Sequence, residues 1–368
     1  MPLALGQSTP TPTPTPTATP CGSKIYNVGG NCGFGCGATN TTRIYDIASD
    51  TWTTGAPIPE PSGLSVHAIA VSNGVIYIAG GGDGGLPVNT VRAYNIATNT
   101  WSTLASMPKA VFVPGFGIIN GKFYVASGSD GDIEVADLQI YDIATNTWST
   151  GAPVPTPVTA PGSAVYQGKL YLFGGGAPFG VSITATQIYD PATNTWTTGP
   201  PMNVARLWFY GAAIADTSIV ASGGDTIVGT PINDNEQLTA TWATKAPLPY
   251  PATGPFVVSD GTFVYIGGGY DGSTARTDTL RYDPVADTYT PLAPAPDPHA
   301  LSQAVIVSFP CATPTATFTP TATATAAATA TATPTATATP TASPTATASK
   351  TPRSTATPRP RPTPRPRP

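Results

Sequence analysis

Charge, histidine and long apolar runs are scarce in this chain. Charged residues make up 10% of its 368 residues, and histidine occurs twice. No segment approaches the roughly 20 apolar residues of a membrane span, and no helical periodicity appears between residues 21 and 311. We therefore expect neither a helical domain nor a membrane span.

Signatures of bound cofactors are also missing. His67 and His299 lie far from the spacings of zinc sites. The glycines at 80–85 follow an apolar segment but open no helical pattern, so they do not form a phosphate loop. All 20 acidic residues lie within 21–311, against 10 basic ones, which argues against a nucleic-acid partner. We predict no cofactor, no metal and no nucleic acid.

Two segments have the composition of disordered tails. Residues 1–20 and 312–368 are mostly Thr, Pro and Ala, which cannot bury enough apolar surface to fold. Residues 1–7 resemble the end of a signal peptide. The C-terminal tail has six basic residues and no acid, so it is either a solvated stalk tip or a contact to an anionic cell surface. We expect a secreted or cell-surface protein.

A repeat occupies the remaining 291 residues, 21–311, which we interpret as one domain. One marker is an aromatic residue, found six times at intervals of 46 to 49 residues. The other marker is a glycine pair at the end of an apolar segment, worn to Ser-Gly in one copy. The aromatic markers are Trp52, Trp101, Trp148, Trp196, Trp242 and Tyr289. Three markers end the motif ATNTW, in which the residues before the Trp form a turn. The copy at Trp242 has lost this turn and is expected to be shortened there.

Each copy predicts four short strands. In the second copy these are 66–71, 75–79, 91–95 and 101–104, with an Asn-Gly hairpin turn between the first two. The first copy starts directly at its second strand, 24–28, while an extra strand, 301–309, follows the last copy. This extra strand fits as the missing first strand, which would close a ring and remove its free edges.

The pattern resembles the kelch repeat. It has an apolar strand running into Gly-Gly, a loop, a strand ending in Tyr-Asp, then Thr-x-Thr-Trp and a proline-rich link. The resemblance implies an all-β, six-bladed propeller with four antiparallel strands per blade, closed by the C-terminal strand. It also implies that the glycines and the tryptophans are structural, which agrees with their chemistry.

A candidate binding site follows from the position of the links. His299 and Arg206 occupy equivalent positions, and we align Gly63, Ala110, Pro157 and Tyr250 with them. The resemblance to kelch repeats implies that this ring lines one mouth of the central channel. Arg and aromatic residues are typical anchors of recognition sites. The predicted rim cluster is Arg206, Trp208, Phe209, Tyr250, Asp297 and His299.

The loops after the glycines are rich in aspartate. Asp-Gly pairs are explained by turn chemistry, and a calcium site, which needs converging oxygen ligands, is the alternative. These aspartates are Asp83, Asp130, Asp132, Asp225 and Asp271.

Two classes of function remain. The first is a monomeric binding module for a protein or glycan ligand. The second is a carbohydrate-active enzyme, since kelch-type propellers include galactose-oxidase-like enzymes and sugar mutarotases or epimerases. The oxidase needs two His, two Tyr and a Cys, but the cysteines in this chain lie at the closure and in the first loop. The innermost strands are mostly Val, Ala, Gly, Pro and Phe, which provide no acid/base set. We favour the binding module.

The four cysteines predict two disulfides. Cys21 precedes the first strand of the ring and Cys311 follows the closing strand, and antiparallel neighbours lie within disulfide range. Cys32 and Cys36 would pair locally within a glycine-rich loop. The alternative is a reduced metal site made of all four thiols.

Overall fold

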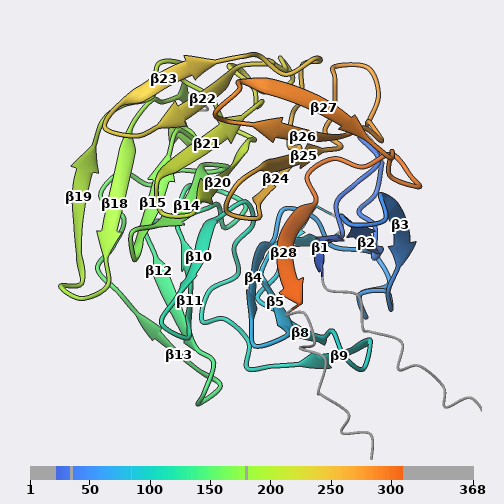
Figure 1. Cartoon of the computed structure of the whole chain (residues 1–368). Helices are drawn as coiled ribbons and strands as arrows, with labels where there is room; N and C mark the ends of the chain where they lie inside the picture. The colour runs from blue at the N-terminus through green and yellow to red at the C-terminus, as the bar shows by residue number, and fades with distance from the viewer. Residues whose placement is uncertain (1–21, 34–35, 84, 179–180, 310–368) are drawn as a thin grey trace, which may run out of the picture. The chain divides into compact units, whose positions relative to one another are not determined.

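A computed structural model describes residues 22–33, 36–83, 85–178 and 181–309. These residues form six four-stranded antiparallel sheets, or blades, arranged in a ring, as Figure 1 shows. We name the strands of each blade A to D from the centre outwards. The predicted tails, 1–20 and 312–368, and the predicted Cys21–Cys311 bridge lie outside the described residues.

Within each blade the strands pair in the order A, B, C, D. Blade 1 contains β28 (Gln303–Phe309), β1 (Gly22–Val28), β2 (Thr42–Asp46) and β3 (Thr51–Thr54). Blade 2 contains β4 (Ala68–Ser72), β5 (Val75–Ala79), β8 (Val91–Asn95) and β9 (Thr100–Thr103). Blade 3 contains β10 (Gly115–Ile119), β11 (Lys122–Ala126), β12 (Leu138–Asp142) and β13 (Thr147–Thr150).

Blade 4 contains β14 (Gly162–Tyr166), β15 (Lys169–Phe173), β18 (Thr186–Asp190) and β19 (Thr195–Gly199). Blade 5 contains β20 (Tyr210–Ile214), β21 (Ser218–Ser222), β22 (Asn235–Leu238) and β23 (Trp242–Lys245). Blade 6 contains β24 (Phe256–Ser259), β25 (Val264–Gly267), β26 (Thr279–Asp283) and β27 (Thr288–Leu292). Two small hairpins, β6 (Gly82–Asp83) with β7 (Leu86–Pro87) and β16 (Gly176–Ala177) with β17 (Val181–Ser182), lie in B–C loops.

The predicted closure is confirmed. β28 pairs antiparallel with β1 over seven residues, from Gly22 opposite Phe309 to Val28 opposite Gln303. Figure 1 shows this strand, coloured orange, beside the blue start of the chain. The closing strand begins two residues later than predicted, because Leu301 has a left-handed backbone with φ of 55°.

The aromatic markers connect neighbouring blades, as predicted. In five blades the marker donates a hydrogen bond to a carbonyl just after strand D of the preceding blade; for Trp148 the acceptor is Ala105 and the distance is 2.8 Å. An Asn or Asp of the C–D turn reinforces this contact. Asn146 accepts from the hydroxyl of Tyr141 and from the backbone N–H of Ala105. The outer strands are therefore joined by one device repeated around the ring.

Blade 5 departs from this device, as its altered turn predicted. Three residues join β22 to β23, whereas four join β8 to β9. Trp242 is buried and donates to the side chain of Thr186 in blade 4 instead of to a link carbonyl. Its ring packs 5.1 Å from that of Phe173.

The glycine markers bring each link close to the preceding blade. Gly80 and Gly81 both have positive φ, and a Cβ on Gly80 would lie 2.5 Å from the carbonyl oxygen of Val111 in the next link. Gly81 donates its N–H to that same oxygen. The pair is therefore required by backbone conformation and by close approach.

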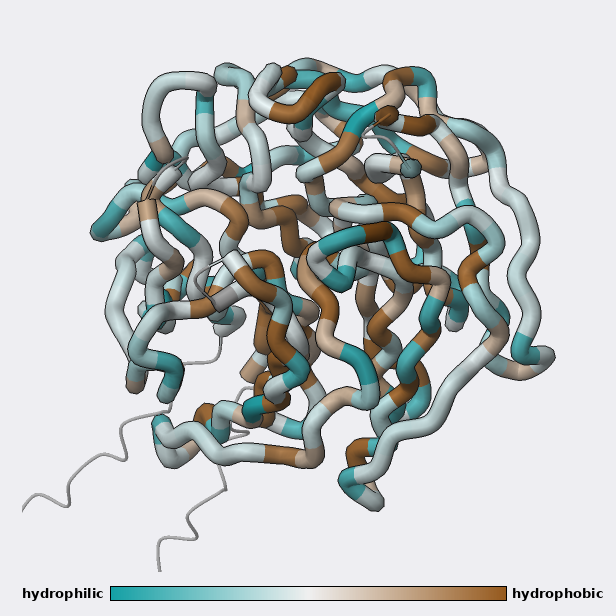
Figure 2. The backbone as a smooth tube through the Cα atoms, turned by 180° about the vertical axis from the view of Figure 1, so that it is seen from behind, coloured by the Kyte–Doolittle hydropathy of each residue, from teal (hydrophilic) through white to brown (hydrophobic). Residues whose placement is uncertain are grey.

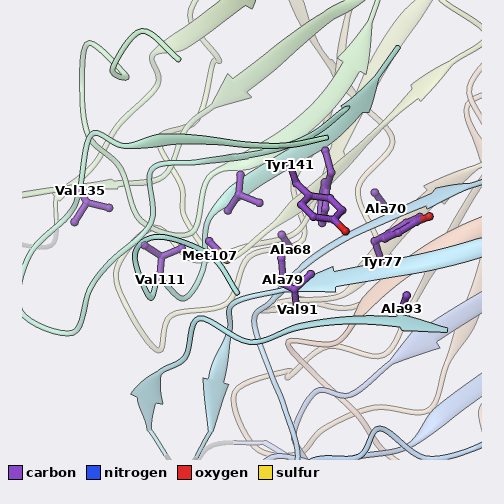
Figure 3. Close-up of a cluster of buried hydrophobic side chains, with 12 residues drawn as sticks. Ala68, Ala70, Tyr77, Ala79, Val91, Ala93, Met107, Val111, Val135 and Tyr141 are labelled. Carbon is purple, nitrogen blue, oxygen red and sulfur yellow. The ribbon is translucent and has the colours of Figure 1, made fainter. Parts of the chain in front are cut away.

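The hydrophobic core lies between the blades rather than in one block. One cluster joins Tyr77 and Ala79 of blade 2 to Phe123 and Tyr141 of blade 3, and Figure 3 shows part of it. Similar clusters fill the other interfaces. In Figure 2 the hydrophobic stretches gather toward the inner strands and the hydrophilic ones toward the outside.

Candidate functional site

Two sets of segments meet at one face of the ring. The A and C strands begin there, so the B–C loops and the D-to-A links lie together on what we call the loop face. The A–B and C–D turns belong to the opposite, turn face. We first locate the predicted rim residues and then describe what the loop face exposes.

Six link residues, one per blade, form a closed ring of backbone hydrogen bonds around the channel. Each donates its N–H to the carbonyl of its counterpart in the neighbouring link, at 2.7 to 3.1 Å. All have left-handed φ between 48° and 59°, which is strained for the β-branched members. The ring residues are Val66, Val113, Ala160, Trp208, Gly254 and Leu301.

This ring corrects the alignment of the links. Arg206 and His299 do share one position, two residues before the ring residue. However, Gly63, Ala110, Pro157 and Tyr250 are not their equivalents, because the irregular links carry no residue that marks the left-handed position. The six equivalent residues, whose carbonyls accept from the second glycine marker, are Leu64, Val111, Val158, Arg206, Ala252 and His299. All six are buried, so this position does not line the mouth.

Arg206 is part of the interior. Its side chain is fully buried and pairs with the equally buried Glu236 at 2.8 Å. It also donates to the carbonyls of Gly223 and Asp234, and its guanidinium lies 5.0 Å from the ring centroid of Phe209. The expectation that Arg206 and Phe209 lie on the rim is therefore wrong, because both fill the space between blades.

His299 and Asp297 belong to the closure. His299 is buried, stacks on Phe256 with 6.0 Å between ring centroids, and has its pKa lowered to about 4, mainly by burial. The expectation that it lies on the rim is wrong. Asp297 is partly exposed and is paired with the buried guanidinium of Arg43 on strand C of blade 1. This ion pair ties the last link to the first blade.

The other two predicted residues lie apart. Tyr250 is buried beneath the guanidinium of Arg276, 4.4 Å from its ring centroid, so it is not a rim residue either. Trp208, a member of the ring, is partly exposed and lines a cavity of the loop face. The residues of the predicted cluster therefore do not form one site. Of its aromatic residues, Trp208 lines the cavity at the mouth.

A cavity of about 510 Å³ lies at this mouth, and we call it the mouth cavity. Its apolar wall comes from the ring and the neighbouring link residue, namely Val66, Phe112, Trp208 and Leu301. Cys36 lies on another side, in the loop of blade 1. The predicted Cys32–Cys36 disulfide is confirmed, with a Cα–Cα distance of 5.4 Å.

The loop face also exposes large apolar side chains. Six are exposed in the described part of the chain, and five of these project from B–C loops of blades 2 to 5. We call these five the apolar rim: Leu86, Ile133, Val181, Ile227 and Val228. The sixth, Val285, lies in a C–D turn of the turn face.

The loops of blades 4 and 5 add a groove to this rim. Ser182 donates to the carbonyl of Thr226 at 2.7 Å, which holds the two loops together. Between them lies a groove of about 640 Å³ lined by Val181, Val204 and Ile227 among others. Reasoning from the sequence missed the rim because these loops share no motif; the only signal was single apolar residues within Gly- and Asp-rich loops.

Three of the loop aspartates, Asp130, Asp225 and Asp271, are engaged in local contacts. Asp130 and Asp271 accept backbone N–H groups of their own loops, which lowers the pKa of both carboxyls, and each pairs with a nearby Lys or Arg. Asp225 is buried and bonded to Thr253 and Gly229, and burial raises its pKa. Across the described residues, no three His, Cys, Asp or Glu side chains are grouped so that they could hold a metal ion. No helix among these residues is long and apolar enough to cross a membrane.

Comparison with known sequences identifies the repeat. A sequence model of the KLHDC2/KLHL20/DRC7 Kelch-repeats domain matches residues 16–224, more than half of the chain. The chain is a kelch-repeat protein. A search of curated proteins found no match.

Among solved structures, the chain is similar in fold to one titled "Structure of YjhT". The TM-score is 0.61 and the identity 18%, with 74% of this chain and 98% of the other covered. At that identity the likeness shows a shared fold and nothing more.

Proposed function

We propose that this kelch propeller is a monomeric protein-interaction module, secreted or displayed at the cell surface, that binds its partner on the loop face. The observation that carries the proposal is the clustering of exposed apolar side chains on one face. Five of the six large apolar residues exposed in the described chain belong to the apolar rim. Exposed apolar groups gathered beside a cavity are typical of protein-binding surfaces.

The mouth cavity supports the same surface. An interface usually has a few buried anchors surrounded by weaker contacts. A side chain of the partner inserted against Phe112, Trp208 and Leu301 would provide such an anchor, and the apolar rim would exclude water around it.

A glycan ligand has less support. Sugars are typically bound by exposed aromatic faces beside polar groups, but the six repeat aromatics are used between blades and bond to protein atoms. An enzymatic role has less support still, because the walls of the central channel contain no Asp, Glu, His, Lys or Arg in the described structure.

The extracellular location rests on two features. The Cys32–Cys36 disulfide is typical of oxidising compartments, and the Thr/Pro-rich ends are typical of surface stalks. Non-reducing peptide mapping of the protein purified from its native source tests this part: a free thiol at Cys32 would contradict it.

The test of binding compares matched variants of the two faces. Affinity capture from the native extracellular fraction is run with the wild type, with Ile227→Ser/Val228→Ser on the loop face, and with Val285→Ser on the turn face. We expect a protein retained by the wild type and by Val285→Ser to be lost with the double variant, while all three melt at similar temperatures. Equal capture by all three would move the interface away from the rim, and sedimentation showing a rim-dependent dimer would contradict the monomer.

A further inference from the structure

The central channel contains a second cavity, separate from the mouth cavity. It measures about 420 Å³ and is lined by the A strands of all six blades: β4, β10, β14, β20, β24 and β28. Cavities of about 300 to 1,000 Å³ with apolar walls and a few polar groups are the usual form of small-molecule sites. The size and lining of this cavity meet that description.

The side chains that face the cavity follow from the alternation of the A strands. The fourth residue after each ring residue is buried in all six blades, whereas the fifth is partly exposed in all six. The fifth residues therefore face the cavity: Val71, Ile118, Val165, Ala213, Ser259 and Ile306. Four of them are branched aliphatics, while Ala213 and Ser259, in adjacent blades, leave the most room.

The end of the channel toward the loop face is filled. The ring residues Val66, Val113 and Ala160 form a buried cluster with Leu207, against which Phe112, Trp208 and Leu301 pack. This plug lies between the channel cavity and the mouth cavity. A molecule in the channel would therefore enter from the turn face, where the A strands end.

Polar groups are concentrated next to the plug. Tyr210 and Gln303, from blades 5 and 1, line this end of the cavity and share a side-chain hydrogen bond. Ser163, in the cavity wall, accepts the N–H of Phe116 through its hydroxyl oxygen, which leaves the hydroxyl hydrogen free to donate. The closed end can thus bond one neutral polar group. The rest of the wall is aliphatic apart from Phe116 and Ser259.

We propose that the channel binds a compact neutral apolar molecule with a single hydroxyl, carbonyl or ester group. Its polar group would bond to Tyr210, Gln303 or Ser163, and its apolar body would lie among the cavity-facing aliphatics. A charged ligand is disfavoured, since the described wall offers no opposite charge to offset its desolvation. This site is independent of the loop face and of the partner proposed for it.

The test uses two dyes with the same ring system. N-phenyl-1-naphthylamine is neutral, and 8-anilino-1-naphthalenesulfonate carries a negative charge. We expect the neutral dye to bind one-to-one with enhanced, blue-shifted fluorescence, to be displaced by 1-decanol, and to bind at least about tenfold more tightly than the sulfonate. Ala213→Phe, which fills the cavity, should abolish binding, whereas Ile227→Ser on the apolar rim should leave it unchanged.

A second variant keeps the test decisive if Ala213→Phe does not fold. Tyr210→Phe removes one hydroxyl, and we expect it to weaken displacement by 1-decanol about fivefold while dye affinity changes little. The proposal is overturned if no saturable binding is seen, if Ala213→Phe folds and still binds, or if Ile227→Ser removes the binding, which would place the dye on the rim.

Discussion

The C–D turns and the B–C loops connect strands of the same sheets but differ in what they do. Five C–D turns use the same contacts: an Asn or Asp at positive φ accepts from a Tyr of its own blade and from the backbone of the preceding blade. The B–C loops repeat only backbone contacts: in each blade the residue after the glycine pair bridges to a residue of a link, but no side-chain contact recurs in all of the described loops, and four of the loops expose apolar side chains. The side-chain contacts that recur from blade to blade hold the propeller together, whereas the candidate partner surface lies in loops whose side chains differ from blade to blade.

This difference also explains how much could be predicted from the sequence. The strands, the number of blades and the closure could be predicted because Trp148 or Gly80 each marks a contact that recurs in almost every blade. The rim could not, since Leu86 and Ile227 occupy loops without a common pattern. The ring of left-handed residues escaped for a related reason: positions occupied by Val66, Trp208 and Gly254 have no shared side chain to reveal them.

The alignment error at the links has the same origin. Polar residues among small ones suggest a binding site, and this pattern favours a rim position for Arg206 and His299. Burial shows instead that their side chains fill space between blades, with Arg206 neutralising Glu236. The predictions below test this division between scaffold and surface, from the largest effect to the smallest.

Arg206 should behave as scaffold although it lies in a link of the loop face. Arg206→Met leaves the buried Glu236 carboxylate without its partner, and we expect a loss of about 3 to 5 kcal/mol in the free energy of unfolding. Adding Glu236→Gln should restore most of the lost stability, because blades 3 and 4 have a glutamine in the corresponding role. Gln139 and Gln187 each accept a backbone N–H of a link, as Glu236 accepts that of Asn203. Chemical denaturation measures the stability of the single and the double variant. If Arg206→Met is as stable as the wild type, Arg206 does not neutralise a buried charge and should be counted among the surface residues.

The buried histidines should make the ring sensitive to mild acid. Burial lowers the pKa of His67 to about 3, and within the described structure neither of its ring nitrogens has a hydrogen-bond partner. Below the ordinary pKa of about 6.5 the unfolded chain binds a proton that the folded chain refuses, so stability falls as pH falls. Between pH 7 and 5 this amounts to about 2 kcal/mol for one such histidine.

His67→Phe should remove that share of the pH dependence. Phe209 occupies the equivalent position in blade 5, directly after the ring residue, so the slot tolerates an aromatic ring. Unfolding measured at pH 7, 6 and 5 should give a shallower loss for the variant than for the wild type. The aspartates that pair with lysines affect the pH dependence of stability only below about pH 5, because their carboxyl pKa values lie under the usual range. Parallel curves would mean that His67 is not buried as a neutral group.

The repeated turns predict a smaller, local effect. Asn146→Gly keeps the left-handed backbone accessible but removes the acceptor of the Tyr141 hydroxyl and the Ala105 N–H. We expect a loss of about 1 to 2 kcal/mol. The control is Ala240→Gly in the shortened turn of blade 5, which is exposed and should change stability by less than about 0.5 kcal/mol. Equal losses at both positions would show that the repeated turn adds nothing beyond backbone stiffness.

The smallest change in stability is expected where the functional effect should be largest. Ile227 and Val285 are both exposed aliphatics, at 68% and 93%, but Ile227 lies on the loop face and Val285 on the turn face. Replacing either with Ser should shift the free energy of unfolding by less than about 0.5 kcal/mol, because little buried apolar contact is lost. If the loop face is the partner surface, Ile227→Ser alone should weaken partner binding, and by more than its effect on stability can explain. A drop in melting temperature for Ile227→Ser with none for Val285→Ser would instead assign the rim to the packing of the loops, and the contrast between C–D turns and B–C loops would then concern stability rather than function.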